Sequence, residues 1–164
     1  MITIHSDELH GQLLEFSKKF RTTLEKGVER FVYKTADILI QSTPYGDDVL
    51  YSDLYEQRQR KYGFKPIAGL AKGSWLMSFD EVVNIPEVAY DNRSGGKSQA
   101  RIHAISQEYQ LGETVYITNS VPYIEKIEQG SSKQAPDGIM DLSLTKLQRL
   151  YGLNVAKLLT GEKK

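Results

Sequence analysis

The sequence has no cysteine among its 164 residues, so it can form no disulfide bond and offers neither a thiolate nucleophile nor a thiolate metal ligand. It has no excess of either charge, because 21 Lys and Arg residues balance 21 Asp and Glu residues. Dedicated nucleic-acid-binding domains are usually basic, so a neutral chain argues against that class. The composition is compatible with a cytosolic protein and with a virion protein, and it does not decide between them.

Long hydrophobic runs are also missing. No stretch approaches the roughly 18 apolar residues that a membrane span needs. The first five residues carry no basic segment, and Asp7 and Glu8 follow at once, which is unlike a secretory signal peptide. We therefore expect a soluble protein made without export. The length suits one domain with a real core, and we treat residues 1–164 as a single domain.

Leucine and phenylalanine recur every three or four residues from Leu9 to Leu24, which predicts an amphipathic helix. The period resumes after Gly27 and runs to Ile40. It ends before Pro44, because the residue preceding a proline disfavours the α conformation. We predict one nearly continuous helix over about 7–42, in which Gly27 costs about 1 kcal/mol. Two helices with a kink at Gly27 are the alternative.

The stretch over about 45–71 has no regular period and is rich in polar residues, and we predict that it forms an inserted arm. Tyrosine suits a contact surface, because its apolar ring carries a polar tip. A basic tract at 57–61 admits three interpretations: a solvated loop, a dock for an acidic partner, or a passing contact with DNA phosphates. The candidate interface residues of the arm are Tyr45, Tyr51, Tyr55, Arg58, Arg60 and Tyr62.

The remainder, over about 73–160, predicts a mixture of strands and helices. The fold class is therefore α+β: a small antiparallel sheet packed by the long N-terminal helix and a C-terminal helix, with a long inserted loop. The expected elements are a strand over 74–83 with Trp75, Met77 and Phe79 on one face, a turn and a possible further strand over 84–92, a helix over 97–110, a strand over 114–118, and a helix from Ile139 that Gly152 ends or bends.

A short helix and a loop follow the strand at 114–118. Ser120 is a candidate N-cap, Pro122 suits a first helical turn, and Gly130 suits the helix end, where φ is positive. So short a helix is unstable alone and must pack on the sheet, which makes this unit the structural hub. Its hub residues are Tyr123, Gly130, Pro136 and Gly138, and its loop adds Ser131, Lys133 and Gln134 to the candidate interface.

Few residues suggest chemistry. Gly95-Gly96-Lys97-Ser98 matches the end of a phosphate-binding P-loop, but Asp91 stands where that motif requires glycine and would place a carboxylate beside a polyanion. The three histidines lack the spacing of metal ligands. Serines 131, 132 and 143 have no base beside them in the sequence. We expect no enzyme activity, no catalytic residue, no cofactor and no metal.

The run Thr118–Tyr123 followed by Ile127–Gly138 resembles the signature of a tailed-phage tail-component family, the neck or tail-completion proteins that join the capsid connector to the tail tube. The dense part of the match covers about a fifth of the chain. The family also has a long N-terminal helix ending in Thr-Pro, as at Thr43-Pro44. Here the first strand begins some ~28 residues later than the family pattern places it, which is a departure.

The resemblance implies a structural virion protein, assembled in the host cytoplasm and built into the neck or tail. It implies a ring of this chain, six copies by the family pattern, in contact with the head-closure or connector protein and with the tail tube or terminator. Genomic DNA would pass nearby. Alternatives are a tail terminator or minor tail protein, a nucleotide-binding enzyme based on the 95–98 motif, and a small bacterial regulator or toxin-like protein.

Overall fold

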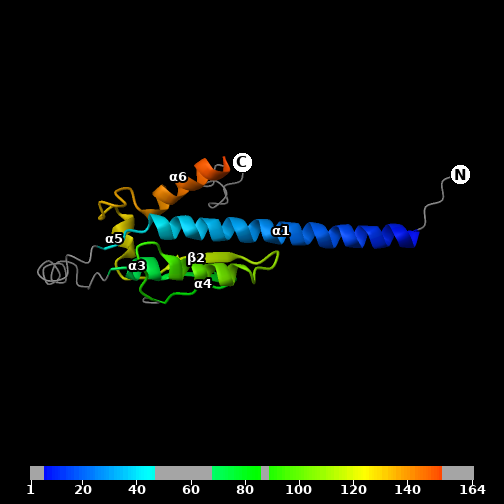
Figure 1. Ribbon diagram of the computed structural model, residues 1–164, viewed down its shortest axis with the longest axis horizontal. Helices are drawn as coiled ribbons and strands as arrows, with labels where there is room; N and C mark the ends of the chain where they lie inside the picture. Colours follow the sequence, from blue (N-terminus) through cyan, green and yellow to red (C-terminus); the bar gives the residue numbers. More distant parts are fainter. Residues whose placement is uncertain (1–5, 47–67, 86–88, 153–164) are drawn as a thin grey trace, which may run out of the picture.

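A computed structural model describes residues 6–46, 68–85 and 89–152 of the chain. These ranges contain several helices and two strands that pair antiparallel, which confirms the α+β class (Figure 1). The elements are α1 (Ser6–Ser42), α3 (Leu70–Gly73), β1 (Trp75–Phe79), α4 (Gly96–Ser106), β2 (Val115–Asn119), α5 (Ile124–Glu128) and α6 (Ile139–Tyr151).

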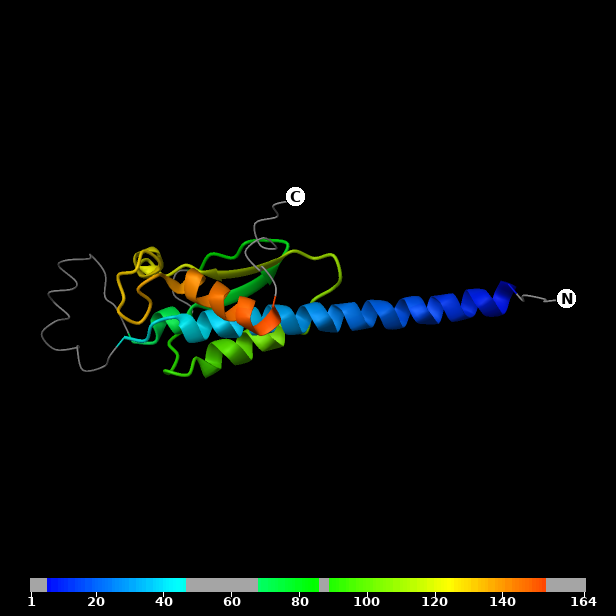
Figure 2. The same ribbon diagram turned by 90° about the horizontal axis from the view of Figure 1, so that it is seen from above.

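Helix α1 is continuous through Gly27, so the single-helix prediction is confirmed over the kinked alternative. Only its C-terminal half packs into the body of the protein. The N-terminal half, here called the α1 arm (residues 6–27), projects from that body, and both views show it extending well past the other elements (Figures 1 and 2). Near the base of the arm, Glu25 accepts a hydrogen bond from the Leu111 N–H (3.4 Å).

The body is built around the C-terminal half of α1, with α6 on one side and α4 and the sheet on the other (Figure 1). Ile40, on α1, is fully buried, and Ile102 of α4 and Ile139 of α6 are also buried. From the sheet, Trp75 and Met77 point into this core, as the alternation predicted, and Phe79 packs on its edge.

Strands β1 and β2 pair antiparallel, with Trp75 opposite Asn119 and Phe79 opposite Val115. The predicted strand over 74–83 is too long, because Asp80 adopts a φ of 59° and turns the chain. Its carboxylate and backbone N–H then bond the backbone of Thr114. The further strand expected in 84–92 is absent from the described part of that range.

Two other boundaries differ from the prediction. Helix α4 ends at Ser106 rather than Gln110, where the Ser106 hydroxyl donates to the carbonyl of His103 and the chain enters turns. Helix α5 starts at Ile124 without a side-chain cap, and the Ser120 hydroxyl instead bonds Asn84. Pro122 lies in the turn that precedes the helix rather than in its first turn.

The predicted arm over 45–71 is wrong at its C-terminal end. Leu70 and Ala71 are almost fully buried in α3, against the core. The sequence does not predict this helix, because four residues are too few to show a helical period. Residues 47–67, which include most of that predicted arm, lie outside the described residues.

We expect Gly27→Ala to stabilise the protein by about 0.5–1 kcal/mol, because alanine forms helix better than glycine. A Cβ at this position meets no atom within 4 Å, so no clash opposes the gain. Chemical denaturation monitored by circular dichroism measures it. A destabilised variant would contradict the continuous helix and favour a functional kink at this position.

Candidate functional site

The P-loop-like turn before α4 is filled by the chain's own carboxylate. Asp91 accepts hydrogen bonds from the backbone N–H groups of Lys97 (3.2 Å) and Ser98 (2.7 Å), and also from that of Asn92. These first N–H groups of a helix are the ones that bind a phosphate in a P-loop. Asp91 occupies that position with a negative charge, which disfavours an anionic ligand.

Burial raises the pKa of the Asp91 carboxyl, but the N–H donors of Ser98, Lys97 and Asn92 lower it, and the net shift is downward. The side chain is 5% exposed. The carboxylate therefore stays ionised in the folded protein and acts as an internal cap for α4 rather than as an acid or base.

A second buried charge, that of Lys72, caps the C-terminal end of α1. Lys72, 4% exposed, donates from Nζ to the carbonyl of Ile40 (2.8 Å) and reaches that of Gln41 (3.5 Å). These carbonyls belong to the last turn of α1, which contains no basic residue of its own. Burial lowers the pKa of Lys72, and the nearby negative charge of Asp91 opposes this. The ammonium group thus complements the negative end of the α1 dipole.

The two caps are joined by close backbone contacts and by Arg101. The Ser98 hydroxyl donates to the carbonyl of Lys72 (2.7 Å), and Arg101 Nη2 donates to the carbonyls of Gly73 (2.7 Å) and Trp75 (2.6 Å). A Cβ on Gly69 would lie 1.9 Å from the Asp91 carbonyl oxygen, so only glycine fits there. We call Lys72, Asp91, Ser98 and Arg101 the polar junction. It is a structural device, with each charge directed at backbone.

We expect Asp91→Asn to destabilise the protein by about 2 kcal/mol, because the amide offers a neutral acceptor to donors that face a carboxylate. The folded-state pKa of Asp91 lies below its unfolded value, so its stabilisation is fully present above about pH 4 and is lost as the pH falls through the folded value. The variant should lose this part of the acid dependence. Urea titrations between pH 2 and 7 measure both effects, with the exposed Asp137→Asn as control.

The predicted hub forms one compact unit. Tyr123 is buried at 7% exposure, and Gly130 has a φ of 80°. A Cβ on Gly130 would lie 2.2 Å from the carbonyl oxygen of Pro136, and one on Gly138 would lie 2.5 Å from that of Glu128. The loop over 131–138 therefore closes tightly onto the end of α5.

Glu128 fixes the end of this loop. Its carboxylate accepts the N–H groups of Ile139 (2.8 Å) and Met140 (3.2 Å) and so caps α6, which the sequence does not predict. A favourable acid at a helix N-terminus normally lies within the helix or just before it. Glu128 comes from eleven residues earlier, which is why spacing does not reveal it.

The structure brings the two predicted interface segments together. Gln134 bonds the backbone of Tyr45 twice, accepting from its N–H (3.1 Å) and donating to its carbonyl (2.8 Å). Arg93, which the sequence analysis does not assign to the interface, lies over the Tyr45 ring at 5.1 Å. Ser131 and Lys133 are exposed. We call Tyr45, Arg93, Ser131, Lys133 and Gln134 the loop face.

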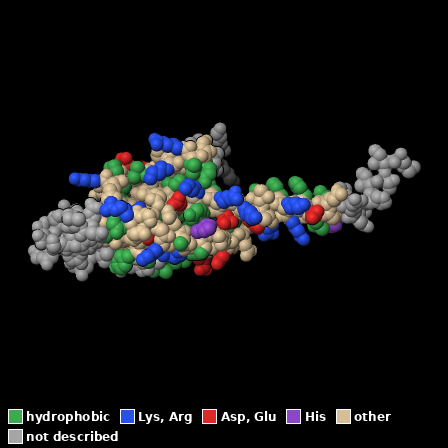
Figure 3. All heavy atoms as spheres, viewed as in Figure 1, with side chains coloured by type: hydrophobic (Ala, Val, Ile, Leu, Met, Phe, Trp, Pro, Cys, Tyr) green, Lys and Arg blue, Asp and Glu red, His purple; other side chains and the backbone are tan. Residues whose placement is uncertain are grey.

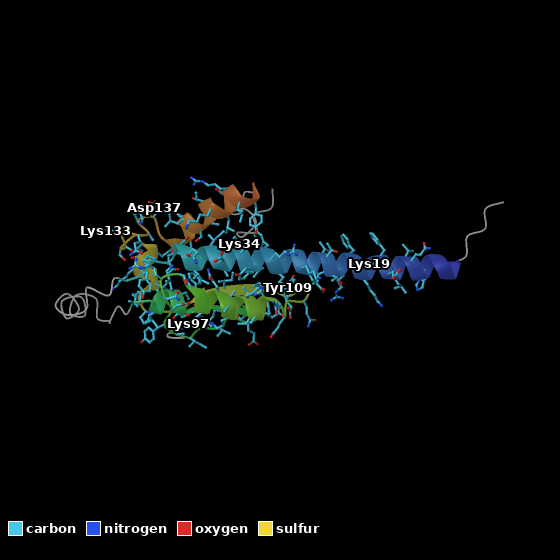
Figure 4. All side chains as sticks on the ribbon, viewed as in Figure 1. Lys19, Lys34, Lys97, Tyr109, Lys133 and Asp137 are labelled. Atoms are coloured by element: carbon cyan, nitrogen blue, oxygen red, sulfur yellow. The ribbon has the colours of Figure 1, made fainter. Side chains whose placement is uncertain are left out.

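The loop face lies at the end of the molecule opposite the α1 arm, where Lys133 and Asp137 project from the loop (Figure 4). Its bonds span 89 residues of sequence, so two distant loops form one preformed polar surface. The remaining candidates, Tyr51, Tyr55, Arg58, Arg60 and Tyr62, lie outside the described residues.

The described residues contain no group of three or more His, Asp or Glu side chains that could hold a metal ion. Among the histidines in these ranges, His10 is exposed on the α1 arm and the His103 ring packs at 4.7 Å from that of Tyr33. Nor does any helix in the described ranges combine the length and apolar character of a bilayer span. The loop face carries the exposed side chains of Ser131, Lys133 and Gln134.

No family model matches the chain, and no curated protein or solved structure is significantly similar to it.

We expect Gly130→Val to destabilise the protein by about 2 kcal/mol or more, through the positive φ and the contact with the Pro136 carbonyl. Gly112→Val is the matched control, because Gly112 also has a positive φ, of 110°, but its Cβ would meet nothing within 4 Å. Thermal melts of the two variants separate strain from contact. Equal melting temperatures would show that the contact with the Pro136 carbonyl costs nothing beyond the strain of the positive φ.

Proposed function

We propose that this protein is a structural virion component of a tailed phage, a neck or tail-completion protein that joins the capsid connector to the tail tube. The observation that supports this most directly is the loop face. The residues that resemble the phage family, 118–123 and 127–138, form one rigid unit, and that unit presents Lys133 and Gln134 at one end of an elongated molecule.

The physical character of this end suits assembly rather than chemistry. Gln134, Gly130 and Glu128 hold the loop in a fixed shape before any partner binds, so little conformational entropy is lost on association. Tyr45 and Arg93 add an aromatic and a guanidinium group, residue types enriched at interfaces.

The proposed assembly is a closed ring of this chain, with six copies taken from the family resemblance. A tail tube is rotationally symmetric, and a ring that sits on it requires a head-to-tail interface that closes. The connector or head-closure protein and the tail tube or terminator would be its neighbours, and genomic DNA would pass through it.

A tail terminator or minor tail protein would use the same surfaces, and the position of the chain in the particle distinguishes these roles. The nucleotide-binding alternative is weaker, because the Asp91 carboxylate takes the N–H groups that a phosphate requires. Titration of the protein with ATP and Mg²⁺ tests that alternative, and saturable binding lost in Lys97→Ala would establish it.

Cryo-electron microscopy of the virion tests the proposal, which expects a ring of this chain between connector and tube. We also expect Lys133→Glu to lower the yield of infectious particles at least about tenfold, because charge reversal at an interface costs more than 1.4 kcal/mol per contact. Glu108→Lys, an exposed reversal between α4 and β2, should leave the yield unchanged. Absence of the chain from purified virions, or a single isolated copy, would overturn the proposal.

A further inference from the structure

The α1 arm carries a stripe of large apolar side chains that nothing in the described part of the protein covers. Leu13, Phe16, Phe20 and Leu24 are 57%, 67%, 56% and 40% exposed. Their spacing of three, four and four residues places them on one face of the helix. Figure 3 shows hydrophobic side chains along the arm, on the side that carries α6.

Within the body, α6 covers this same face of α1. Phe31 and Ile38 follow Leu24 at steps of seven residues, so they continue the stripe. Phe31 packs against Tyr151 at 5.2 Å, and Ile38 packs against Leu147. Helix α6 runs antiparallel to α1. Lys146 bonds Ser42 at the end of α1, whereas Tyr151, which comes later in α6, packs against Phe31, which comes earlier in α1. The stripe is therefore suited to packing against an antiparallel helix, and among the described residues its cover extends to Phe31.

The open part of the stripe reads nearly the same in both directions, Leu-Phe-Phe-Leu. Leu13 and Leu24 are centred near residue 18, and so are Phe16 and Phe20. A second copy turned end to end about this centre therefore sets leucine against leucine and phenylalanine against phenylalanine. The same register places the partner's first helical residue, Ser6, opposite Phe31, where Tyr151 ends the cover. The length of the arm and the symmetry of its stripe thus give the same alignment.

A parallel, in-register pair is disfavoured by the body. Helix α6 lies on the stripe face of each α1, so two parallel copies would place both α6 helices in the space between the α1 helices. The antiparallel pair puts the two bodies at opposite ends and leaves only the arms in contact.

The contact area is that of a small interface, at the low end of the range for specific pairs. The overlap from Ser6 to Phe31 is about 39 Å long at 1.5 Å per residue. The eight stripe side chains of two copies bury on the order of 800 Å² if each covers roughly 100 Å², and flanking side chains along the arm raise this toward the ~1,200 Å² at which standard interfaces begin.

We infer that free subunits pair through the α1 arm, as an antiparallel two-helix homodimer centred near residue 18. This contact is separate from the loop face and from the proposed ring. All subunits of a polar ring point the same way, so the pair has to separate before a ring closes. It keeps the apolar arm covered in the unassembled protein.

The absence of cysteine makes the register directly testable. Leu13→Cys and Leu24→Cys are made as separate full-length proteins and oxidised alone and mixed. The antiparallel pair gives a covalent dimer only in the mixture, because residue 13 of one copy faces residue 24 of the other and lies about 16 Å along the helix from its own counterpart. Cross-linking of either variant alone would establish a parallel pair and overturn the proposal.

Light scattering after size-exclusion chromatography tests the stripe without cysteine. We expect a dimer for the unmodified chain. For Phe16→Glu/Phe20→Glu we expect a dimer dissociation constant at least about 30-fold higher, because two large aromatic contacts are lost. Leu14→Glu is the matched control, because Leu14 is 52% exposed on the same arm but lies off the stripe, and it should leave the dimer intact. A monomeric unmodified chain would overturn the proposal and indicate that residues 153–164 or a different protein covers the stripe.

Discussion

The fold depends on the groups that form hydrogen bonds with the C-terminal end of α1. A long helix ends in several carbonyls without intrahelical partners and carries a partial negative charge there. Pro44 stops the helix inside the body, so these carbonyls cannot all face water. Lys72 meets them with a buried ammonium group, and Lys146 bonds the Ser42 hydroxyl at the same end. The indole of Trp75 donates to Thr43 one residue further on. One helix end thus receives groups from α3, β1 and α6.

The same junction explains why the connecting backbone is so tightly packed. Asp91 must reach the first N–H groups of α4 while Lys72 reaches α1, and the backbone of Gly69 passes against that of Asp91 to bring them together. Burying two charges costs several kcal/mol unless each finds a full set of partners. Lys72 and Asp91 bond backbone groups at the ends of α1 and α4 rather than each other. These bonds offset the desolvation cost of the two charges and also fix the positions of the two helices. The junction therefore sets geometry as much as it adds stability.

The sequence predicts the parts of this fold whose signal is periodic or local. The recurrence of Leu and Phe predicts α1, alternation at Trp75 and Met77 predicts the buried face of β1, and glycine with proline predicts the closed hub. It does not predict Lys72 and Glu128 as helix caps, because each caps a helix from a separate segment and no spacing rule describes such a contact. The predicted length of a strand is also wrong where one residue leaves the extended conformation, as Asp80 does at the end of β1. The sequence predicts Tyr45 and the loop at 131–134 as separate candidate segments, and the bonds between Gln134 and Tyr45 that join them depend on the tertiary fold alone.

Periodicity has a further limit, which the two halves of α1 illustrate. The stripe from Leu13 to Ile38 is uniform in sequence, yet its second half is covered by α6 and its first half is open. A hydrophobic period indicates that one face of a helix is buried in a contact, but it does not indicate whether the same chain or another chain forms that contact. In this protein the cover changes where α6 ends, at Tyr151. The charged end of α1 is therefore satisfied within the subunit, whereas none of the described residues covers the apolar stripe of its arm. In the pairing that we propose, association of two subunits would depend on the same hydrophobic effect that closes the core of each one.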